Sequence, residues 1–233
     1  MGLAAVLGAA GAIGWSVLRA PTAEQIEAAG EKEIATRWSG LPAGEIFPAQ
    51  VKEDLSRGWA SQYADKGSWG VARRLGIAPE VPCAQGFDAK LAEVLVKNGC
   101  RTVLRATYID SSGTLVTTVG IAVLGDTRQA GRAESAISTT FGGAVKESIG
   151  LRAAAFPGTA ASGFTDAQRH DFWMDFPQSP YLFFRSSGWA LDRGKVGPKA
   201  RVEDFRFARI VQDQVLDRLS DQTKPCERKR VRC

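Results

Sequence analysis

The clearest pattern in the chain is an alternation of apolar and polar residues over 102–110, followed by a second apolar run over 114–124. The apolar residues that share one side of the first segment are Leu104, Ala106 and Tyr108. Such alternation is typical of β-strands, and the Ser-Ser-Gly sequence at 111–113 is typical of a turn. These residues therefore predict a β-hairpin.

Other segments have apolar positions at helical spacing. Thr22 and Gln25 can form a capping box at the start of one helix. Asp88 is a plausible N-cap of a second helix, and Asp126 or Thr127 of a third. The predicted helices cover 22–38, 88–97, 126–138 and 203–219. Weaker patterns predict strands over 41–51, 151–156 and 180–192, a loop or imperfect helix over 56–70, and a surface loop over 154–166.

Strand pairs followed by helices predict an α+β domain, with an antiparallel sheet and helices packed on one face, preceded by a single N-terminal transmembrane helix. The predicted organisation is an N-terminal membrane anchor over 1–20, a helical stalk over 21–40, an α+β extracytoplasmic domain over 41–222 and a basic tail over 223–233.

The predicted anchor is an uncharged run over residues 2–18 that ends before Arg19. As a helix it would span about 26 Å, slightly less than the roughly 30 Å hydrocarbon core of a bilayer. We expect a single-pass signal anchor, with a cleaved signal peptide and a buried core helix as the alternatives. Because Lys and Arg are absent before the run and Arg19 follows it, charge alone does not establish that the domain faces outward.

The four cysteines form two pairs that are local in the sequence, Cys83 with Cys100 and Cys226 with Cys233. An even count behind a membrane-targeting segment predicts two disulfides, and free buried thiols are the alternative. A zinc site is a poor fit, because the sequence contains no CxxC motif and only one histidine, His170.

Charge is concentrated at the C-terminus. The formal net charge is +5, of which residues 224–233 carry +4. A domain that binds nucleic acid usually spreads positive charge over a folded face, so no nucleic-acid partner is expected. The composition, 44% hydrophobic and 24% charged, is that of an ordinary globular protein.

Candidate chemistry is sparse. His170, which we place on a short surface helix, has Asp166, Asp171 and Asp175 nearby in the sequence, but no GxSxG motif supplies a nucleophile. The aromatic residues that could line a ligand groove are Phe172, Trp173, Phe176, Phe183 and Phe184, although core packing accounts for most of them. The sequence therefore predicts no catalytic residue, no metal site and no cofactor.

Several motifs resemble a group of actinobacterial (Streptomyces-like) membrane-anchored exported proteins of unknown function: LPAGEIFP, RRLGIAP, GCRTVLRATYID, VTTVGIAVL, AAFPGT, PYLFF and GWALDRG. The resemblance implies one N-terminal membrane helix and an exported domain at the cell membrane. We therefore expect a membrane-anchored envelope protein that is a non-enzymatic binding or accessory module. The alternative is an extracytoplasmic hydrolase that acts on cell-wall or peptide substrates. The expected partners are the lipid bilayer, through residues 2–18, and an envelope protein or an anionic cell-wall polymer.

Overall fold

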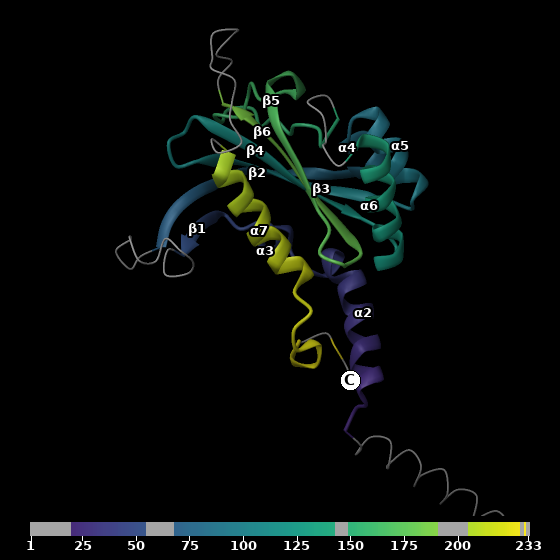
Figure 1. The fold of residues 1–233 in the computed structure, drawn as a ribbon. Coiled ribbons are helices and arrows are strands. Elements are labelled where there is room, and N and C mark those ends of the chain that lie inside the picture. Colours follow the sequence, from purple (N-terminus) through teal and green to yellow (C-terminus); the bar gives the residue numbers. More distant parts are fainter. Residues whose placement is uncertain (1–19, 55–67, 143–148, 191–204, 229–230, 232–233) are drawn as a thin grey trace, which may run out of the picture. The chain divides into compact units, whose positions relative to one another are not determined.

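A computed structural model describes residues 20–54, 68–142, 149–190, 205–228 and 231 (Figure 1). The chain divides into two compact units, Met1–Glu33 with Gln222–Cys233, and Ile34–Asp221. The second unit contains the whole sheet. In the first unit, the predicted capping box is present: the Thr22 amide donates to Gln25 Oε1 at 2.9 Å, and the Gln25 amide donates to Thr22 Oγ1 at 3.3 Å.

A curled sheet of six strands, in the order β1-β2-β3-β4-β6-β5, forms the centre of the second unit. Every neighbouring pair is antiparallel, which confirms the predicted α+β class and the antiparallel sheet. The strands are β1 (Gln50–Asp54), β2 (Ser68–Pro82), β3 (Thr102–Asp110), β4 (Leu115–Val123), β5 (Arg169–Asp175) and β6 (Tyr181–Trp189).

The predicted hairpin is confirmed as β3 and β4, which pair from Thr102 with Val123 to Ile109 with Val116. Asp110 fixes the turn, because its Oδ1 accepts hydrogen bonds from the amides of the first two residues after the turn, at 2.9 Å each. The helices are α2 (Ala23–Gly40), α3 (Ala43–Ile46), α4 (Cys83–Gly86), α5 (Ala89–Lys97), α6 (Thr127–Phe141) and α7 (Arg206–Ser220), with short 3₁₀ turns η2 (Asp166–Gln168) and η4 (Pro225–Glu227).

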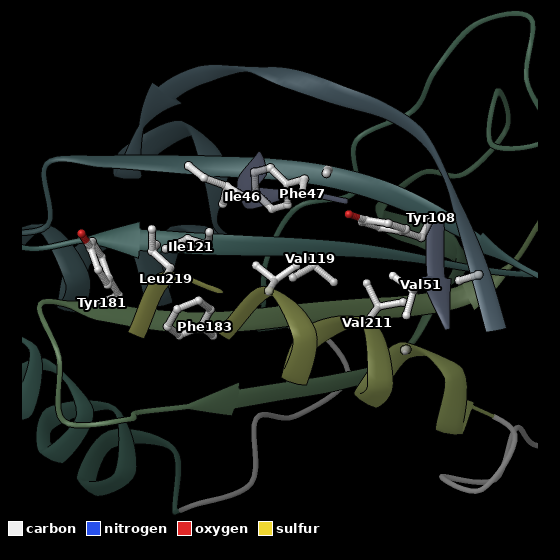
Figure 2. Close-up of a cluster of buried hydrophobic side chains, with 14 of the residues drawn as sticks. Ile46, Phe47, Val51, Tyr108, Val119, Ile121, Tyr181, Phe183, Val211 and Leu219 are labelled. Atoms are coloured by element: carbon white, nitrogen blue, oxygen red, sulfur yellow. The ribbon is translucent and has the colours of Figure 1, made fainter. Parts of the chain in front are cut away.

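Helices cover both faces of the sheet, so the prediction of helices on one face is wrong. Figure 2 shows the first cluster, in which Val211 and Leu219 of α7 pack on Val119, Ile121 and Phe183 of the sheet. On the other face α5 and α6 cover a second cluster. Its largest buried members are Phe87, Leu91, Leu95 and Phe184. Adjacent strand residues alternate between the two clusters, because successive side chains point to opposite faces.

Several segments differ from their predicted structure. Residues 41–51 contain the helix α3 and only the start of β1, and 151–156 has just one bridge residue, Leu151, paired with Phe87. His170 lies in strand β5, not on a short helix. The segment 56–70, predicted as a loop or an imperfect helix, falls mostly outside the described residues, and its last residues begin β2.

The segment 154–166 is mostly exposed and has no strand or helix before η2, as predicted for a surface loop, but two of its side chains are anchored in the core. Ala161 and Phe164 are fully buried in a third cluster with Ile109 and Val116. This segment therefore completes the cover of the same face as α5 and α6.

No helix in the described part of the chain has the length and apolar character that a membrane span requires. The predicted anchor falls almost entirely on residues 1–19, which lie outside the described residues.

Candidate functional site

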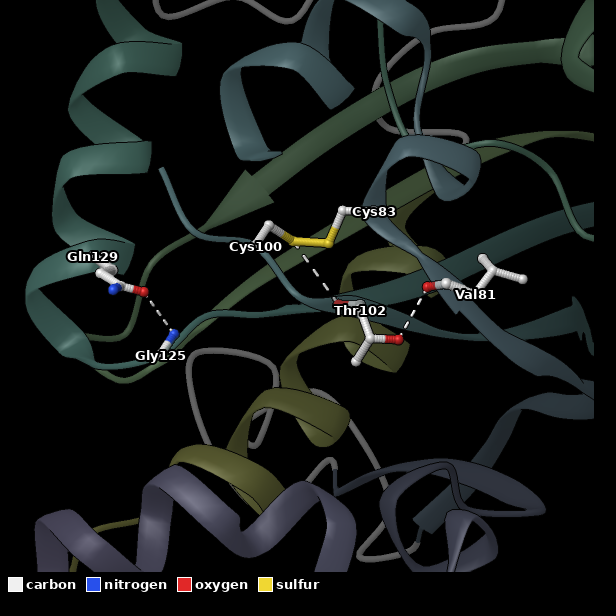
Figure 3. The surroundings of a disulfide bond; sticks show 6 residues. All are labelled: Val81, Cys83, Cys100, Thr102, Gly125 and Gln129. Carbon is white, nitrogen blue, oxygen red and sulfur yellow. Dashed lines mark hydrogen bonds between the residues drawn. A yellow bond between two sulfur atoms is a disulfide. The ribbon is translucent and has the colours of Figure 1, made fainter. Parts of the chain in front are cut away.

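The predicted pair Cys83 and Cys100 forms a disulfide, with 6.1 Å between the two Cα atoms (Figure 3). The bond joins the start of α4 to the residue that precedes β3 by two positions, and both cysteines are buried. Beside it, Thr102 Oγ1 donates to the Val81 carbonyl at 3.0 Å. Because the sulfur atoms are shielded, this bond is a structural element of the fold.

Cys226 is also disulfide-bonded. The partner that the sequence predicts for it, Cys233, lies outside the described residues.

The structure separates His170 from the three carboxylates that surround it in the sequence. His170 is exposed at an irregularity in β5, where the pairing register with β6 shifts between Arg169 and Asp171. Asp166 accepts a hydrogen bond from the Ala153 amide at 2.8 Å. Within the described residues, no hydrogen bond joins His170 to a carboxylate, so a Ser-His-Asp arrangement is not assembled around it.

Asp171 and Asp175 are brought together instead, in a polar network between β5, β6 and α7. Strand alternation directs residues 171, 173 and 175 of β5 toward the face that α7 covers, and Trp173 lies directly opposite Arg185 of β6. We call the group formed by Asp171, Trp173, Asp175, Arg185 and Gln212 the Trp173 site.

Hydrogen bonds connect the members of the Trp173 site one after another, from Asp171 at one end to Trp173 at the other. Arg185 Nε donates to Asp171 Oδ2 at 2.9 Å, and Arg185 Nη1 donates to Gln212 Oε1 at 3.0 Å. Gln212 Nε2 donates to Asp175 Oδ2 at 2.8 Å, and the indole Nε1 of Trp173 donates to Asp175 Oδ1 at 3.0 Å. The guanidinium of Arg185 also lies 5.7 Å from the centroid of the Trp173 ring. The network thus holds the indole from its edge and from one face.

The burial of these residues is uneven. Arg185 is 5% exposed and Gln212 is fully buried, whereas Trp173 is 52% exposed. Buried charged groups are retained only where they are paired and hydrogen-bonded, and here they are. The result is an exposed aromatic ring on a rigid, buried support.

Acidic groups lie along one side of the Trp173 site. Burial raises the pKa of Asp213, the neighbour of Gln212 on α7, and the charges of Asp175 and Asp217 raise it further, against the opposing effect of Arg209 and Arg185. The net effect disfavours the charged form of Asp213.

Most of the aromatic residues that could line a groove are explained by packing. Phe183 and Phe184 point to opposite faces and are buried in the first and second clusters. Phe172 and Phe176 lie on the face opposite Trp173, each partly buried. The sequence signal for β5 is weak, because Phe172, Trp173 and Met174 are consecutive apolar residues that do not alternate with polar ones.

An open depression of about 680 Å³ lies against α6, on the other face of the sheet. It is lined by Asn98, Arg128, Gly131, Arg132, Glu134, Ser135 and Phe176. No group of three or more His, Cys, Asp or Glu side chains within the described ranges is placed to hold a metal ion.

No protein-family model, curated protein or solved structure matches the chain, so the function is argued from the site itself.

Proposed function

We propose that this chain is a membrane-anchored binding module of the cell envelope, without catalytic activity of its own, that recognises a protein partner through the Trp173 site. The observation that carries the proposal is the half-exposed indole of Trp173, held by Asp175 and Arg185 on a buried network. Trp and Arg are enriched among the residues that dominate binding energy at protein interfaces. A ring that is already fixed loses little side-chain entropy on binding.

The free-energy cost of burying these charged and polar groups supports the same interpretation. A well-packed apolar pair in place of a buried ion pair such as Arg185 and Asp171 is often equally or more stable. Core stability alone therefore does not require Arg185, Asp171 and Gln212 beneath the ring. These polar groups have a role in orienting Trp173, which apolar side chains in their place would not perform.

The chemistry of the rim favours a protein over an anionic polymer at this site. Burial raises the pKa of Asp213, and the carboxylates of Asp175 and Asp217 raise it further, against the opposing effect of Arg209 and Arg185. A polyanion would add to this repulsion, whereas a partner with an apolar anchor and basic side chains would relieve it.

The disulfide between Cys83 and Cys100 supports a location outside the cytoplasm, because such bonds persist in oxidising compartments and are rare where thiols are kept reduced. The membrane anchor over residues 2–18 and the resemblance to exported actinobacterial proteins stay predictions from the sequence.

The proposal is tested by placing a photo-crosslinking amino acid at Arg209 of the full chain in its native membrane, because Arg209 is exposed on α7 and pairs with Asp213 beside the Trp173 site. We expect a discrete crosslinked species, weakened at least fivefold when Trp173→Ala removes the indole. The matched control carries the crosslinker at Val96, which is 49% exposed on α5. Equal crosslinking at both positions, or crosslinking at 209 that Trp173→Ala leaves unchanged, would overturn the proposal.

The enzymatic alternative is tested on the same full chain in detergent, incubated with cell-wall polymers and with peptides. We expect no turnover. Turnover lost in His170→Ala would replace the non-enzymatic proposal with a hydrolase, and turnover that survives this change would direct the search to the carboxylates.

A further inference from the structure

The two edges of the sheet differ in how their backbone groups are satisfied. At one edge, Gln214 of α7 donates to the Lys52 carbonyl of β1. At the other edge, β5 pairs with β6 alone. Within the described residues, no group outside β6 forms a hydrogen bond with the backbone of residues 170–175. Unpaired backbone groups along an edge strand are a template for another strand.

The ladder between β4 and β6 shows which way the backbone groups of β6 point. At one end of this ladder, the Leu124 amide donates to the Pro180 carbonyl at 2.9 Å. At the other end, the Ala190 amide donates to the Thr114 carbonyl at 2.9 Å. Hydrogen-bonded pairs alternate with non-bonded pairs along an antiparallel ladder. The even-numbered residues of β6 therefore bond to β4, and the odd-numbered residues face β5.

The same alternation identifies the outward groups of β5. The odd-numbered residues of β6 lie opposite residues 171, 173 and 175, so these three bond to β6. Phe172 and Met174 therefore direct their N–H and C=O groups away from the sheet. Trp173 lies between them and is 52% exposed. A strand added beside β5 would bond to Phe172 and Met174 and bring its own side chains to about 5 Å from that of Trp173.

The charge beside Trp173 indicates the chemistry of such a strand. Asp171 is paired with Arg185 at 2.9 Å. Asp175 accepts hydrogen bonds from the neutral groups of Trp173 and Gln212, at 3.0 and 2.8 Å, and in the described part of the chain no Lys or Arg nitrogen lies within 4 Å of its carboxylate. A carboxylate without a counter-ion, next to an exposed indole, is suited to a Lys or Arg side chain that pairs with the carboxylate and lies over the ring.

We propose that β5 accepts an extended, basic segment of a partner protein as an additional strand, bound through the outward backbone groups of Phe172 and Met174, with a Lys or Arg of that segment paired with Asp175. In this mode of recognition, main-chain hydrogen bonds supply affinity and alternate side chains supply specificity. A second copy of this chain is a poorer fit, because it would bring the same carboxylates to the edge. The inference rests on the proposed function, since it specifies how the partner of the Trp173 site is bound.

The first test uses the full chain in its native membrane, with the photo-crosslinking amino acid at Arg209. Met174→Pro removes the outward N–H without removing a bond to β6, and proline is tolerated in edge strands where the N–H faces away from the sheet. We expect the yield of the crosslinked species to fall roughly tenfold. Met174→Ala is the matched control, because it shortens the same side chain and keeps the N–H, and its yield should stay within about twofold of the wild type.

The outcomes separate this inference from the proposed function. Crosslinking that depends on Trp173 but is equal in Met174→Pro and Met174→Ala would overturn strand addition and leave the Trp173 site as the contact. No crosslinking at Arg209 would overturn both. A crosslinked species with the mass of two copies of this chain would overturn the proposed occupant in favour of a second copy.

Hydrogen exchange gives a second measurement that needs no substitution in β5. In the complex captured at Arg209, we expect the amides of Phe172 and Met174 to exchange at least about tenfold more slowly than in the free chain, because they become hydrogen-bonded. The amides of Asp171 and Trp173, already bonded to β6, should change little. Unchanged exchange at Phe172 and Met174 would contradict strand addition even where Met174→Pro lowers the yield by disturbing the fold.

The charge of the partner segment is tested with Asp175→Asn, which removes the negative charge. We expect the crosslinking yield at Arg209 to fall roughly tenfold, because a charge-assisted hydrogen bond is lost. Glu93→Gln removes an exposed carboxylate from α5, away from the Trp173 site, and should change the yield by less than about twofold. Equal yields in these two variants would rule out a basic side chain paired with Asp175.

Discussion

Gly188 is a residue whose identity follows from one close approach. It lies in β6, where the backbone carbonyl of Gln168 and the ring of Phe164 lie directly over its Cα. A Cβ at this position would overlap the Gln168 carbonyl oxygen, and a backbone atom does not move aside as the end of a flexible side chain does. The join between η2 and the sheet therefore requires glycine at this position.

We predict that Gly188→Ala lowers the free energy of unfolding by about 2–3 kcal/mol, because β6 and the turn before β5 would have to separate. Urea unfolding followed by tryptophan fluorescence measures this change. Gly163→Ala is the matched control, since nothing lies within 4 Å of a Cβ there, and it should change stability by less than about 0.5 kcal/mol. Equal effects of the two substitutions would show that the close approach is absent.

Single residues also show how far the sequence could predict the site. Asp88 was expected as the N-cap of α5, and it occupies that position, but its carboxylate binds Arg169 and the Gly150 amide instead of the helix. Asp126 does cap α6, because its Oδ1 accepts from the Gln129 amide at 2.7 Å. Local spacing determines where such residues lie, whereas the contacts of Asp88 depend on Arg169, 81 residues away.

At the scale of elements, the disulfide closes the segment that contains α4 and α5. The two cysteines are 17 residues apart in the sequence. The buried residues Leu91 and Leu95 of α5 belong to the second cluster. In the chain-entropy description, a cross-link over this length removes about 3 kcal/mol of freedom from the unfolded chain.

We predict that Cys83→Ala/Cys100→Ala lowers the free energy of unfolding by about 3 kcal/mol. The measurement is urea unfolding in a background of Cys226→Ser/Cys233→Ser, so that only one disulfide is present. Adding reductant to that background should reproduce the loss, and adding it to the full cysteine-free variant should have no effect. An unchanged unfolding midpoint on reduction would contradict the prediction.

Most of the elements that the sequence predicts have one dominant period, whereas α2 is recognisable from its capping box. The hairpin β3–β4 and the helices α5, α6 and α7 have a regular apolar pattern over nine residues or more. Strand β2 was not predicted, because its 15 residues contain Gly, Pro and adjacent arginines, and its pairing with β3 shifts register twice. The sequence predicts a short helix at His170 where the structure has β5. The two aspartates on the face of β5 toward α7 become recognisable as part of a strand only beside Arg185 and Gln212.

At the scale of the molecule, the incorrect prediction that helices cover only one face of the sheet has a specific origin. Strand β4 is buried at eight consecutive positions, from Val116 to Val123. Strands that are covered on both faces have such continuous apolar runs, whereas one-sided sheets alternate. The run over 114–124 therefore already contained the evidence for a second layer.

The final prediction concerns the compartment of the whole protein. In the full chain isolated from its native membrane with thiols blocked at lysis, we expect Cys83 and Cys100 to react with a maleimide reagent only after denaturation and reduction. The physical reason is that a disulfide formed in an oxidising compartment survives, whereas the same pair facing the cytoplasm would be kept reduced. Mass analysis of the labelled protein measures the number of thiols.

Cys83→Ala is the control, because it leaves Cys100 unpaired, and Cys100 should then react on denaturation without reductant. Labelling of both Cys83 and Cys100 in the unreduced wild type would place the domain on the reducing side of the membrane and remove the case for an envelope module.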